Sequence, residues 1–559
     1  MMHLRTSRNT RSQRPEQEYT CLERNEYMPT RTTTQETPQL MHAQRLIIAS
    51  NRGPVEYQLS HDGTPKPRRG AGGMVTALID VGNQMDVTWV AMAMTEGDRI
   101  ALREAQQKGE LLSSPLRGQK MQLRYVVISK AAYRKHYEKI SNQLLWFLQH
   151  YLIDPTQDLN TLRHIEEDWN DGYVVANRAI AEAINEEIER ADSMPVVMLQ
   201  DYHLYLTAGM IRQMQREKHP SVVIQQFIHI PWPDVRCWHF LPSNITHAIY
   251  SGLVGNDIIG FQTERDAHNF LEGARTLLED AEVDFEDGSI IWQGNRTLAR
   301  AYPISISVTE ERRIVNSLAG KRATEKIKPL LREKNIMRVD RLEPTKNILR
   351  GFQAYDQLLE TYPEFHGKVT FLAFLVPSRQ SLPIYRRYSA DVLHAIEEIN
   401  SKYGTDEWTP IHAFCDNDRT RALAAMQFYD VLLVNPIIDG MNLVAKEGPV
   451  VNKVDGVLVL SRTAGAFHQL AKGSIPISPT DVSETVSALY RALTLSPEER
   501  KHKAALARQA VERNNLQTWL TRQFNDLNVL LDEVAGKAES AATPREALPA
   551  LGDHVTASA

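Results

Sequence analysis

Short apolar strands alternate with amphipathic helices along most of this 559-residue chain. Continuous runs of Val, Ile and Leu are typical of strands buried on both faces, as in parallel sheets. The predicted strands are 46–49, 87–91, 196–199, 222–224, 257–261, 369–373, 411–413, 431–434 and 457–460. Repeated strand–helix units predict an α/β fold with helices on both faces of each sheet. Because one sheet cannot hold so many units, the sequence predicts two Rossmann-like domains facing across a cleft.

The predicted domains are 45–305 and 306–535, with the boundary near 303–308. Residues 1–44 are rich in Arg, Thr, Gln and Glu, and residues 536–559 in Ala, Ser, Thr and Pro, so both are predicted to be disordered. An apolar stripe along Leu516–Val534 predicts a final helix. We expect this helix to cross back onto the first domain rather than to form a dimer.

Composition excludes several classes of protein. A net charge of −5 gives no global basic field for nucleic acid or membranes. No apolar stretch approaches the roughly 18–20 residues that span a bilayer. The three cysteines, Cys21, Cys237 and Cys415, are widely spaced and form no metal or disulfide pattern, which favours a reducing cytoplasm. The sequence leaves a homo-oligomer open.

The stretch Asp439–Glu447 follows the predicted strand 431–434 and carries chemistry suited to a sugar nucleotide. Gly440 allows a tight turn and a close backbone approach, and a helix is expected to begin near Asn442. Free N–H groups at such a helix start suit a phosphate. Asp439 can accept hydrogen bonds from sugar hydroxyls, and Glu447 can reach a ribose diol. The alternative is an Asp cap on a helix that carries an ordinary surface Glu.

A second element supplies two cations five residues apart. Arg341 and Lys346 are predicted on a loop that leads into a helix over 348–360, with Thr345 as its cap. A cation pair beside a helix start suits a diphosphate leaving group. The alternative is a solvated surface pair, and Glu343 is interpreted as a simple salt-bridge partner.

Polar clusters also follow the predicted strands of the first half. They are Asn51-Arg52, the glycine-rich loop 70–73, Asp201–His203 and His229–Pro233. Clusters at the carboxyl ends of parallel strands meet at the crevice where open α/β sheets bind ligands. Tyr137 and Trp146 lie nine residues apart and could stack on sugar faces. Each of these features has a structural alternative. The glycine loop could be an ordinary turn, and His229 could be a structural side chain. Tyr137 and Trp146 could pack in the core.

In their order along the chain, these motifs resemble the trehalose-6-phosphate synthases, retaining glycosyltransferases of the GT-B architecture. The resemblance covers about residues 45–535. It implies a first domain for a sugar-phosphate acceptor and a second for a nucleotide-sugar donor. The implied reaction moves glucose from an NDP-glucose to glucose 6-phosphate with retention of configuration, as the first step of trehalose biosynthesis. No cofactor is implied, and two cations are expected to replace a metal.

The resemblance also implies site residues. The implied catalytic residues are Arg341, Lys346, Asp201, His229 and Asp439. The implied donor-binding residues are Gly73, Arg341, Lys346, Asp439, Gly440, Met441, Asn442, Leu443, Val444 and Glu447. The implied acceptor-binding residues are Arg52, Tyr137, Trp146, Asp201 and Arg379.

Three departures from the family pattern leave the acceptor and the nucleobase open. They are Leu342-Glu343-Pro344, Pro231-Trp232-Pro233 and Gly448-Pro449. Alternatives are a glucosylglycerol-phosphate synthase, a validoxylamine-7′-phosphate synthase type of transferase, or a non-catalytic regulator that binds sugar phosphates. Retention of Arg341, Lys346 and Glu447 disfavours the regulator.

Overall fold

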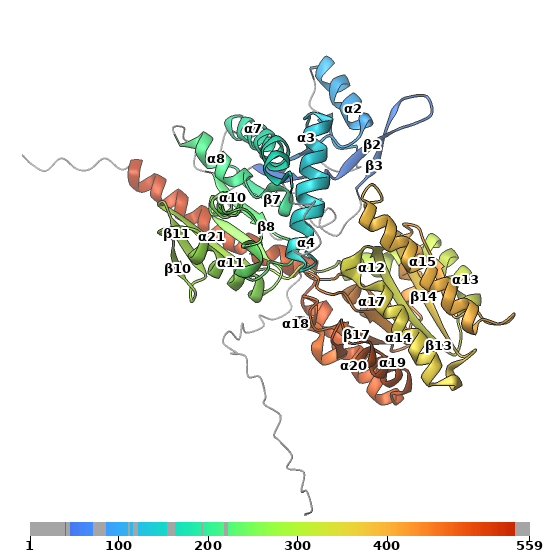
Figure 1. Ribbon diagram of the computed structural model, residues 1–559. Coiled ribbons are helices and arrows are strands. Elements are labelled where there is room, and N and C mark those ends of the chain that lie inside the picture. Colours follow the sequence, from blue (N-terminus) through green and yellow to red (C-terminus); the bar gives the residue numbers. More distant parts are fainter. Residues whose placement is uncertain are drawn as a thin grey trace, which may run out of the picture. The chain divides into compact units, whose positions relative to one another are not determined.

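The computed structural model describes residues 40, 45–70, 85–109, 112–115, 121–153, 163–191, 194–216 and 222–542 (Figure 1). The predicted disordered segment 1–44, residue 40 apart, and the glycine-loop residues Gly72 and Gly73 lie outside this range. So do residues 543–559. The last helix extends over residues 536–542 of the predicted tail.

The first domain is built on a ten-stranded sheet. In spatial order its strands are β10 (Glu282–Asp284), β11 (Ser289–Trp292), β12 (Asn295–Ala301), β9 (Ile258–Phe261), β8 (Val223–Phe227), β7 (Val196–Gln200), β1 (Arg45–Ser50), β4 (Asp86–Met92), β6 (Met121–Val126) and β5 (Leu112–Ser113). The seven strands from β12 to β6 pair in parallel, and the edge strands β5, β10 and β11 pair antiparallel.

Alternate side chains of these strands enter separate cores, as the pleat requires. Ile47 and Ala49 of β1 pack with helices α7 (Val175–Glu189) and α8 (Thr207–Gln215) on one face. Leu46 and Ile48 belong to the core on the other face, which also takes in the final helix. The strand is therefore buried on both sides, which explains its unbroken apolar sequence.

The second domain holds a six-stranded sheet in which every strand is parallel. Its spatial order is β15 (Ile411–Phe414), β14 (Val369–Pro377), β13 (Lys334–Leu342), β16 (Val431–Val434), β17 (Val457–Ser461) and β18 (Ser474–Ile477). One face packs on α14 (Ile348–Thr361), α15 (Pro383–Tyr403) and α19 (Val482–Thr494). The helices α12 (Val308–Asn316), α13 (Leu318–Ile327), α16 (Arg419–Met426), α17 (Val444–Val451) and α20 (Pro497–Arg513) pack with the other core.

The remaining elements join these layers. The helices are α2 (Glu96–Gln107), α3 (Lys130–Arg134), α4 (Trp146–Gln149), α6 (Ile165–Asp168), α9 (Val235–Trp238), α10 (Ser243–Leu253), α11 (Glu264–Leu277) and α18 (Phe467–Leu470). Two π-helical segments, η2 (Lys135–Leu145) and η3 (Trp169–Val174), continue α3 and α6. A hairpin joins β2 (Val55–Leu59) to β3 (Pro65–Arg69). Short 3₁₀ turns lie at Tyr202–Leu204, Lys328–Leu330, Pro344–Lys346, Pro363–Phe365 and Ala471–Gly473.

The last helix, α21 (Leu516–Ala542), crosses back to the first domain as predicted. Trp519 stacks edge-on against Phe227 of β8 with ring centroids 5.3 Å apart. The amide of Gln225 donates to the buried Gln523 carbonyl at 2.9 Å. Figure 1 shows this red helix among the green elements of the first domain. The polar contact at this interface fixes the helix against the strand that ends at the cleft.

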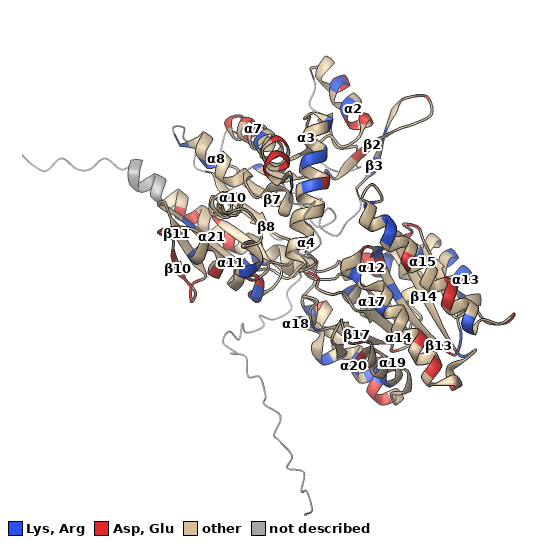
Figure 2. Cartoon of the chain, viewed as in Figure 1, with Lys and Arg blue, Asp and Glu red and all other residues tan. Residues whose placement is uncertain are grey.

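No helix in the described part of the chain is long and apolar enough to cross a membrane. Figure 2 shows Lys and Arg interspersed with Asp and Glu along the helices of both domains. This mixture agrees with the small net charge of the sequence.

Candidate active site

A cleft of about 780 Å³ takes its walls from both domains. The predicted site residues that line it are Arg52, Tyr137, His229, Arg341, Lys346, Arg379, Asp439, Met441, Asn442 and Leu443. Asn142 lines it as well, and so does Gln262, which the sequence did not indicate. The basic side chains therefore face the space between the domains, not an outer surface.

The loop after β16 brings a carboxylate to this cleft. Asp439 pairs with the ammonium of Lys346 and accepts a hydrogen bond from the Asn442 amide at 3.0 Å. Burial acts to raise the pKa of Asp439, but the charge and hydrogen bond of Lys346 outweigh it and the net pKa is lowered. Asn442 has φ 75° and its side-chain oxygen accepts from the N–H of Ala445 at 3.2 Å. The helix thus begins at Val444, two residues later than predicted.

Gly440 lies where the two domains touch. A Cβ atom at this position would overlap the backbone carbonyl of His229 in the first domain. The predicted need for a close backbone approach is therefore confirmed. The neighbouring strand end of the first domain therefore limits how near the loop after β16 can come.

Two local predictions around the cation pair were wrong. Arg341 belongs to β13, because that strand pairs with β14 as far as Leu342 and Pro377. Thr345 does not cap the next helix, since its hydroxyl donates to Glu343 at 3.3 Å. Asn347, with φ 55°, stands before the helix instead.

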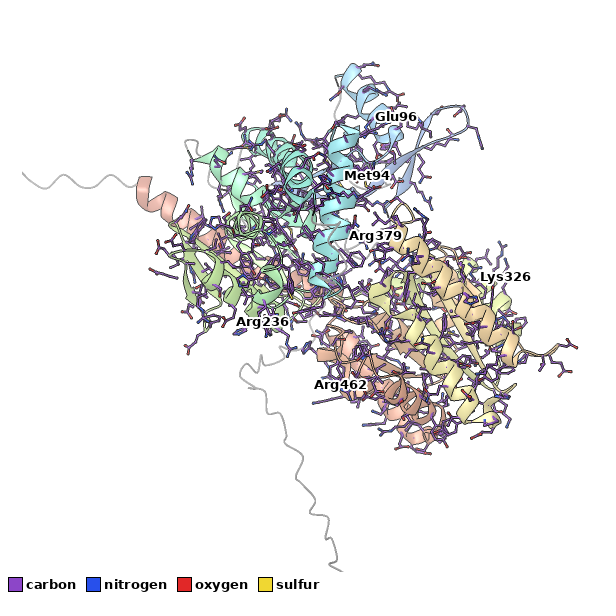
Figure 3. The ribbon with its side chains drawn as sticks, viewed as in Figure 1. Met94, Glu96, Arg236, Lys326, Arg379 and Arg462 are labelled. Atoms are coloured by element: carbon purple, nitrogen blue, oxygen red, sulfur yellow. The ribbon has the colours of Figure 1, made fainter. Side chains whose placement is uncertain are left out.

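Trp146 lies beneath two arginines of the second domain. The Arg379 guanidinium carbon is 4.0 Å from the centre of the indole ring, and that of Arg341 is 5.4 Å away. Arg379 also donates to the hydroxyls of Tyr385 at 2.8 Å and Tyr202 at 3.2 Å. Figure 3 labels Arg379 near the helices of the first domain. Because Trp146 is buried, it orients the two cations and does not line the cleft itself.

Glu343 forms ion pairs with the same two arginines. Its fully buried carboxylate lies 2.9 Å from Arg341 Nη2 and 3.2 Å from Arg379 Nη1. Burial acts to raise the pKa of Glu343, but the neighbouring cations lower it below the ordinary value. The predicted salt-bridge partner is therefore shared by two residues of the site.

Asp201 ends β7 in an unusual conformation with φ 71°. Its carboxylate accepts the backbone N–H of His229 at 3.1 Å. Burial raises the pKa of Asp201 to about 7, against the pull of backbone hydrogen bonds and of the two arginines. Burial also lowers the pKa of His229 to about 3, so its imidazole is neutral at neutral pH. Its Nε2 lies 3.1 Å from the Gln200 amide oxygen, which orients the ring.

Glu447, on α17, has a cation partner that the sequence did not indicate. Arg419 lies 3.1 Å from Glu447 and 2.5 Å from Glu311 of α12. Burial raises the pKa of Glu311 to about 7, and the like charge of Glu447 adds to this effect. One arginine is thus shared by two carboxylates, from three separate helices.

The other predicted residues have mixed positions. Tyr137 stacks on Tyr133 with ring centroids 5.5 Å apart, and the half-exposed Arg52 lies 3.4 Å from Glu56. Val444 and Glu447 do not line the main cavity of the cleft. Gly73 lies outside the described residues. Among the residues that the structure describes, no three His, Cys, Asp or Glu side chains are grouped to hold a metal.

Two of the three departures from the family pattern involve residues that pack away from the cleft. The buried Trp232 packs against Trp238 and donates to the Tyr250 hydroxyl at 3.1 Å, within the core of the first domain. Gly448 lies against Leu432 and Tyr429, where a Cβ atom would overlap. Neither change reaches the cleft, whereas Glu343 contacts two arginines that line it.

Two parallel-sheet domains with a cation-lined cleft between them define a glycosyltransferase of the GT-B architecture. A family model described as glycosyltransferase family 20 matches residues 44–529. The chain belongs to this family, and it is a retaining glycosyltransferase.

Named relatives agree with this assignment. The chain is 30% identical over 468 residues to a UDP-forming α,α-trehalose-phosphate synthase of Schizosaccharomyces pombe, covering 82% of this chain and 86% of the relative. It is 28% identical to a validamine 7-phosphate valienyltransferase of Streptomyces hygroscopicus subsp. jinggangensis, covering 87% and 95%. The chain spans only 57% of the length of an Arabidopsis thaliana relative described as a probable UDP-forming α,α-trehalose-phosphate synthase.

Solved structures of the same family superimpose well. One, from E. coli and bound with UDP-2-fluoro glucose, has a TM-score of 0.72 at 26% identity, covering 87% of this chain and 99% of the other. Another is a UDP-forming α,α-trehalose-phosphate synthase from Burkholderia xenovorans in complex with glucose-6-phosphate. It has a TM-score of 0.71 at 26% identity, covering 86% and 99%.

Proposed function

We propose that this chain transfers glucose from a nucleoside diphosphate glucose to glucose 6-phosphate with retention, which yields α,α-trehalose 6-phosphate. The observation that carries the proposal is the pair Arg341 and Arg379 over the single ring of Trp146. Two separate guanidinium groups, side by side in one cleft, suit two phosphorylated substrates that must meet. The names of the relatives support UDP-glucose as the donor.

The donor is held in the second domain. Arg341 and Lys346 face its diphosphate from the end of β13 and the turn that follows. Asp439, fixed by its pair with Lys346, accepts hydrogen bonds from the glucose hydroxyls. Glu447 takes the ribose diol, held in place by Arg419.

The acceptor is held between the domains. Arg379 and Arg52 take its 6-phosphate, and Tyr137 stacks beside it at the wall of the cleft. Asp201 and His229 lie where the acceptor hydroxyl meets the donor sugar. A neutral His229 contributes a hydrogen bond without adding charge at the reacting carbon.

The chemistry follows from fixed positive charge. The bond from the anomeric carbon to the diphosphate oxygen breaks, and a bond to the acceptor hydroxyl oxygen forms on the same face. The hydroxyl proton passes to a departing phosphate oxygen, so no side chain has to act as a base. Arg341 and Lys346 stabilise the charge that develops on the leaving group. We propose that these two cations make a divalent metal unnecessary.

The test is a grid of donors and acceptors with products identified by mass and by anomeric NMR couplings. Donors are UDP-, GDP- and ADP-glucose, and acceptors are glucose 6-phosphate, glycerol 3-phosphate and validamine 7-phosphate. We expect the UDP-glucose and glucose 6-phosphate pair to give trehalose 6-phosphate with an α,α linkage, with and without EDTA. Faster turnover of a cyclitol or glycerol phosphate would replace the proposed acceptor, and loss of activity with EDTA would contradict the metal-free mechanism.

A further inference from the structure

Glu343 connects parts of the site that serve different substrates. Its two carboxylate oxygens face different arginines: Oε1 lies near Arg341 and Oε2 near Arg379. In the proposed function Arg341 serves the donor diphosphate and Arg379 the acceptor phosphate. Both guanidinium groups also lie over the Trp146 ring, so each contacts the ring as well as the carboxylate.

The charges in the cleft leave Glu343 as the counter-ion of these two arginines. The third cation, Lys346, has its own partner in Asp439. Within the cluster of Arg341, Arg379, Lys346, Glu343 and Asp439, three cations and two carboxylates leave one net positive charge. The fourth cation that lines the cleft, Arg52, is paired with Glu56. A carboxylate at this place lowers the attraction for both ligands, because like charges repel. A site selected only for affinity would not keep it.

The Glu343 carboxylate orients the guanidinium groups of Arg379 and Arg341. Both Nη1 hydrogens of Arg379 are used, on Glu343 and on the Tyr385 hydroxyl, and one Nη2 hydrogen is used on Tyr202. Among the described contacts none uses Nε or the second Nη2 hydrogen of Arg379, and these two donors suit the oxygens of a phosphate. Arg341, with 45% of its side chain exposed, is held only by Glu343 and the Trp146 ring among the described contacts.

A purely structural role is the competing explanation. A buried ion pair by itself is weak evidence for stability, since removing charges from water costs about as much as their attraction returns. What sets Glu343 apart from the other buried carboxylates that the structure describes is that both of its arginine partners line the cleft. The buried Thr345 adds a hydroxyl that donates to the carboxylate at 3.3 Å.

We propose that Glu343 is a positioning residue shared by the donor and acceptor sites, which gives up anion affinity to orient Arg341 and Arg379 together. The inference rests on the proposed function. It assigns one carboxylate to two substrates, and it predicts that turnover and affinity respond to its removal in opposite directions.

The experiment compares Glu343→Gln with the unaltered full-length chain. We expect kcat, with both substrates saturating, to fall about 10- to 100-fold, because misplaced catalytic groups cost rate. Calorimetry with UDP alone and with glucose 6-phosphate alone should show both Kd values smaller by about three- to tenfold, because one negative charge is gone. Glu343→Asp keeps the charge and reaches less far, so it should lower kcat while leaving both Kd values near those of the unaltered chain. Asp356→Asn, an exposed carboxylate on α14 that pairs with Lys402, is the matched control.

Each other result overturns the inference. An unchanged kcat in Glu343→Gln would remove the positioning role. Weaker binding of both ligands with a lowered Tm would show a structural role. A change in one Kd alone would show that Glu343 serves a single arginine. If the unaltered chain bound both ligands without transferring glucose, the proposed function would fail, while the two binding measurements would still decide the role of Glu343.

Discussion

Removing the Lys346 ammonium gives the most direct test of the mechanism. Its Nζ pairs with Asp439 at the cleft and lies on the side from which the diphosphate departs in the proposed reaction. Loss of one well-placed charge-stabilising donor lowers kcat by about 10²–10³, or about 3–4 kcal/mol of transition-state stabilisation. We expect Lys346→Met to show this loss with a much smaller change in KM, because the cation acts mainly on charge that develops during bond breaking.

The same change leaves a carboxylate without its partner. In the unaltered chain Lys346 lowers the pKa of Asp439, so the pair stabilises the fold above the ordinary carboxyl pKa and the stability is lost as pH falls through the lowered value. In Lys346→Met burial dominates and the pKa rises. Loss of one partner costs about 3–5 kcal/mol in a fully buried pair, and we expect on the order of 2 kcal/mol here because both side chains keep some exposure.

The assay measures UDP release and trehalose 6-phosphate formation at saturating substrates, with Tm recorded from pH 4 to pH 8. Lys402→Met is the control, because Lys402 pairs with Asp356 away from the cleft and is half exposed. We expect the Tm difference between Lys346→Met and the unaltered chain to be larger at pH 7 than at pH 4. Near-normal kcat in a folded Lys346→Met variant would refute the role of the cation. A pH-independent Tm difference would refute the ion-pair account of Asp439.

Three further changes test other parts of the site. Gly440→Ala forces a methyl group against the His229 carbonyl, so kcat should fall about tenfold as the donor loop shifts, and unchanged kinetics would contradict the close contact. Arg419→Met frees Glu447, so calorimetry should show the Kd for UDP about tenfold larger with that for glucose 6-phosphate unchanged; equal weakening of both would count against a donor-only role. Burial raises the pKa of Asp201 to about 7, so its ionisation opposes folding as pH rises from the ordinary carboxyl range to neutrality. Asp201→Asn should therefore raise Tm at pH 8 more than at pH 5, and an equal shift at both would be evidence against this.

The sheets could be predicted because a strand that is buried on both faces has an unbroken apolar sequence. Val431–Val434 is observed with the predicted bounds. The end of β13 could not be predicted in this way, because Asp340 and Arg341 look like loop residues. Pairing with β14 continues through them, and the buried Asp340 is stabilised there by Arg338 at 2.8 Å. A local pattern cannot show that a neighbouring strand continues to pair through charged residues.

Some residues of the cleft could also be predicted from the sequence, and others could not. Lys346 and Asp439 were predicted from strand ends and charge, and the structure brings them into contact. Arg419 was missed because its partners come from helices that begin more than 20 residues away on either side. The place of Trp232 could not be predicted either, since only the fold shows that its ring lies in the core.

Contacts between the domains decide where the donor loop lies. Gly440, before α17, meets the carbonyl of His229, and Lys446 within α17 donates to the backbone of Ile304 at 2.7 Å, in the connection between the domains. The buried Gln262 joins these two points, since it donates to the His229 carbonyl and accepts from the Ile304 N–H. The helix that carries the donor loop is thus fastened to the first domain at two places. Two-domain enzymes commonly close on their substrates, and we expect such a motion in this chain to pivot around these contacts.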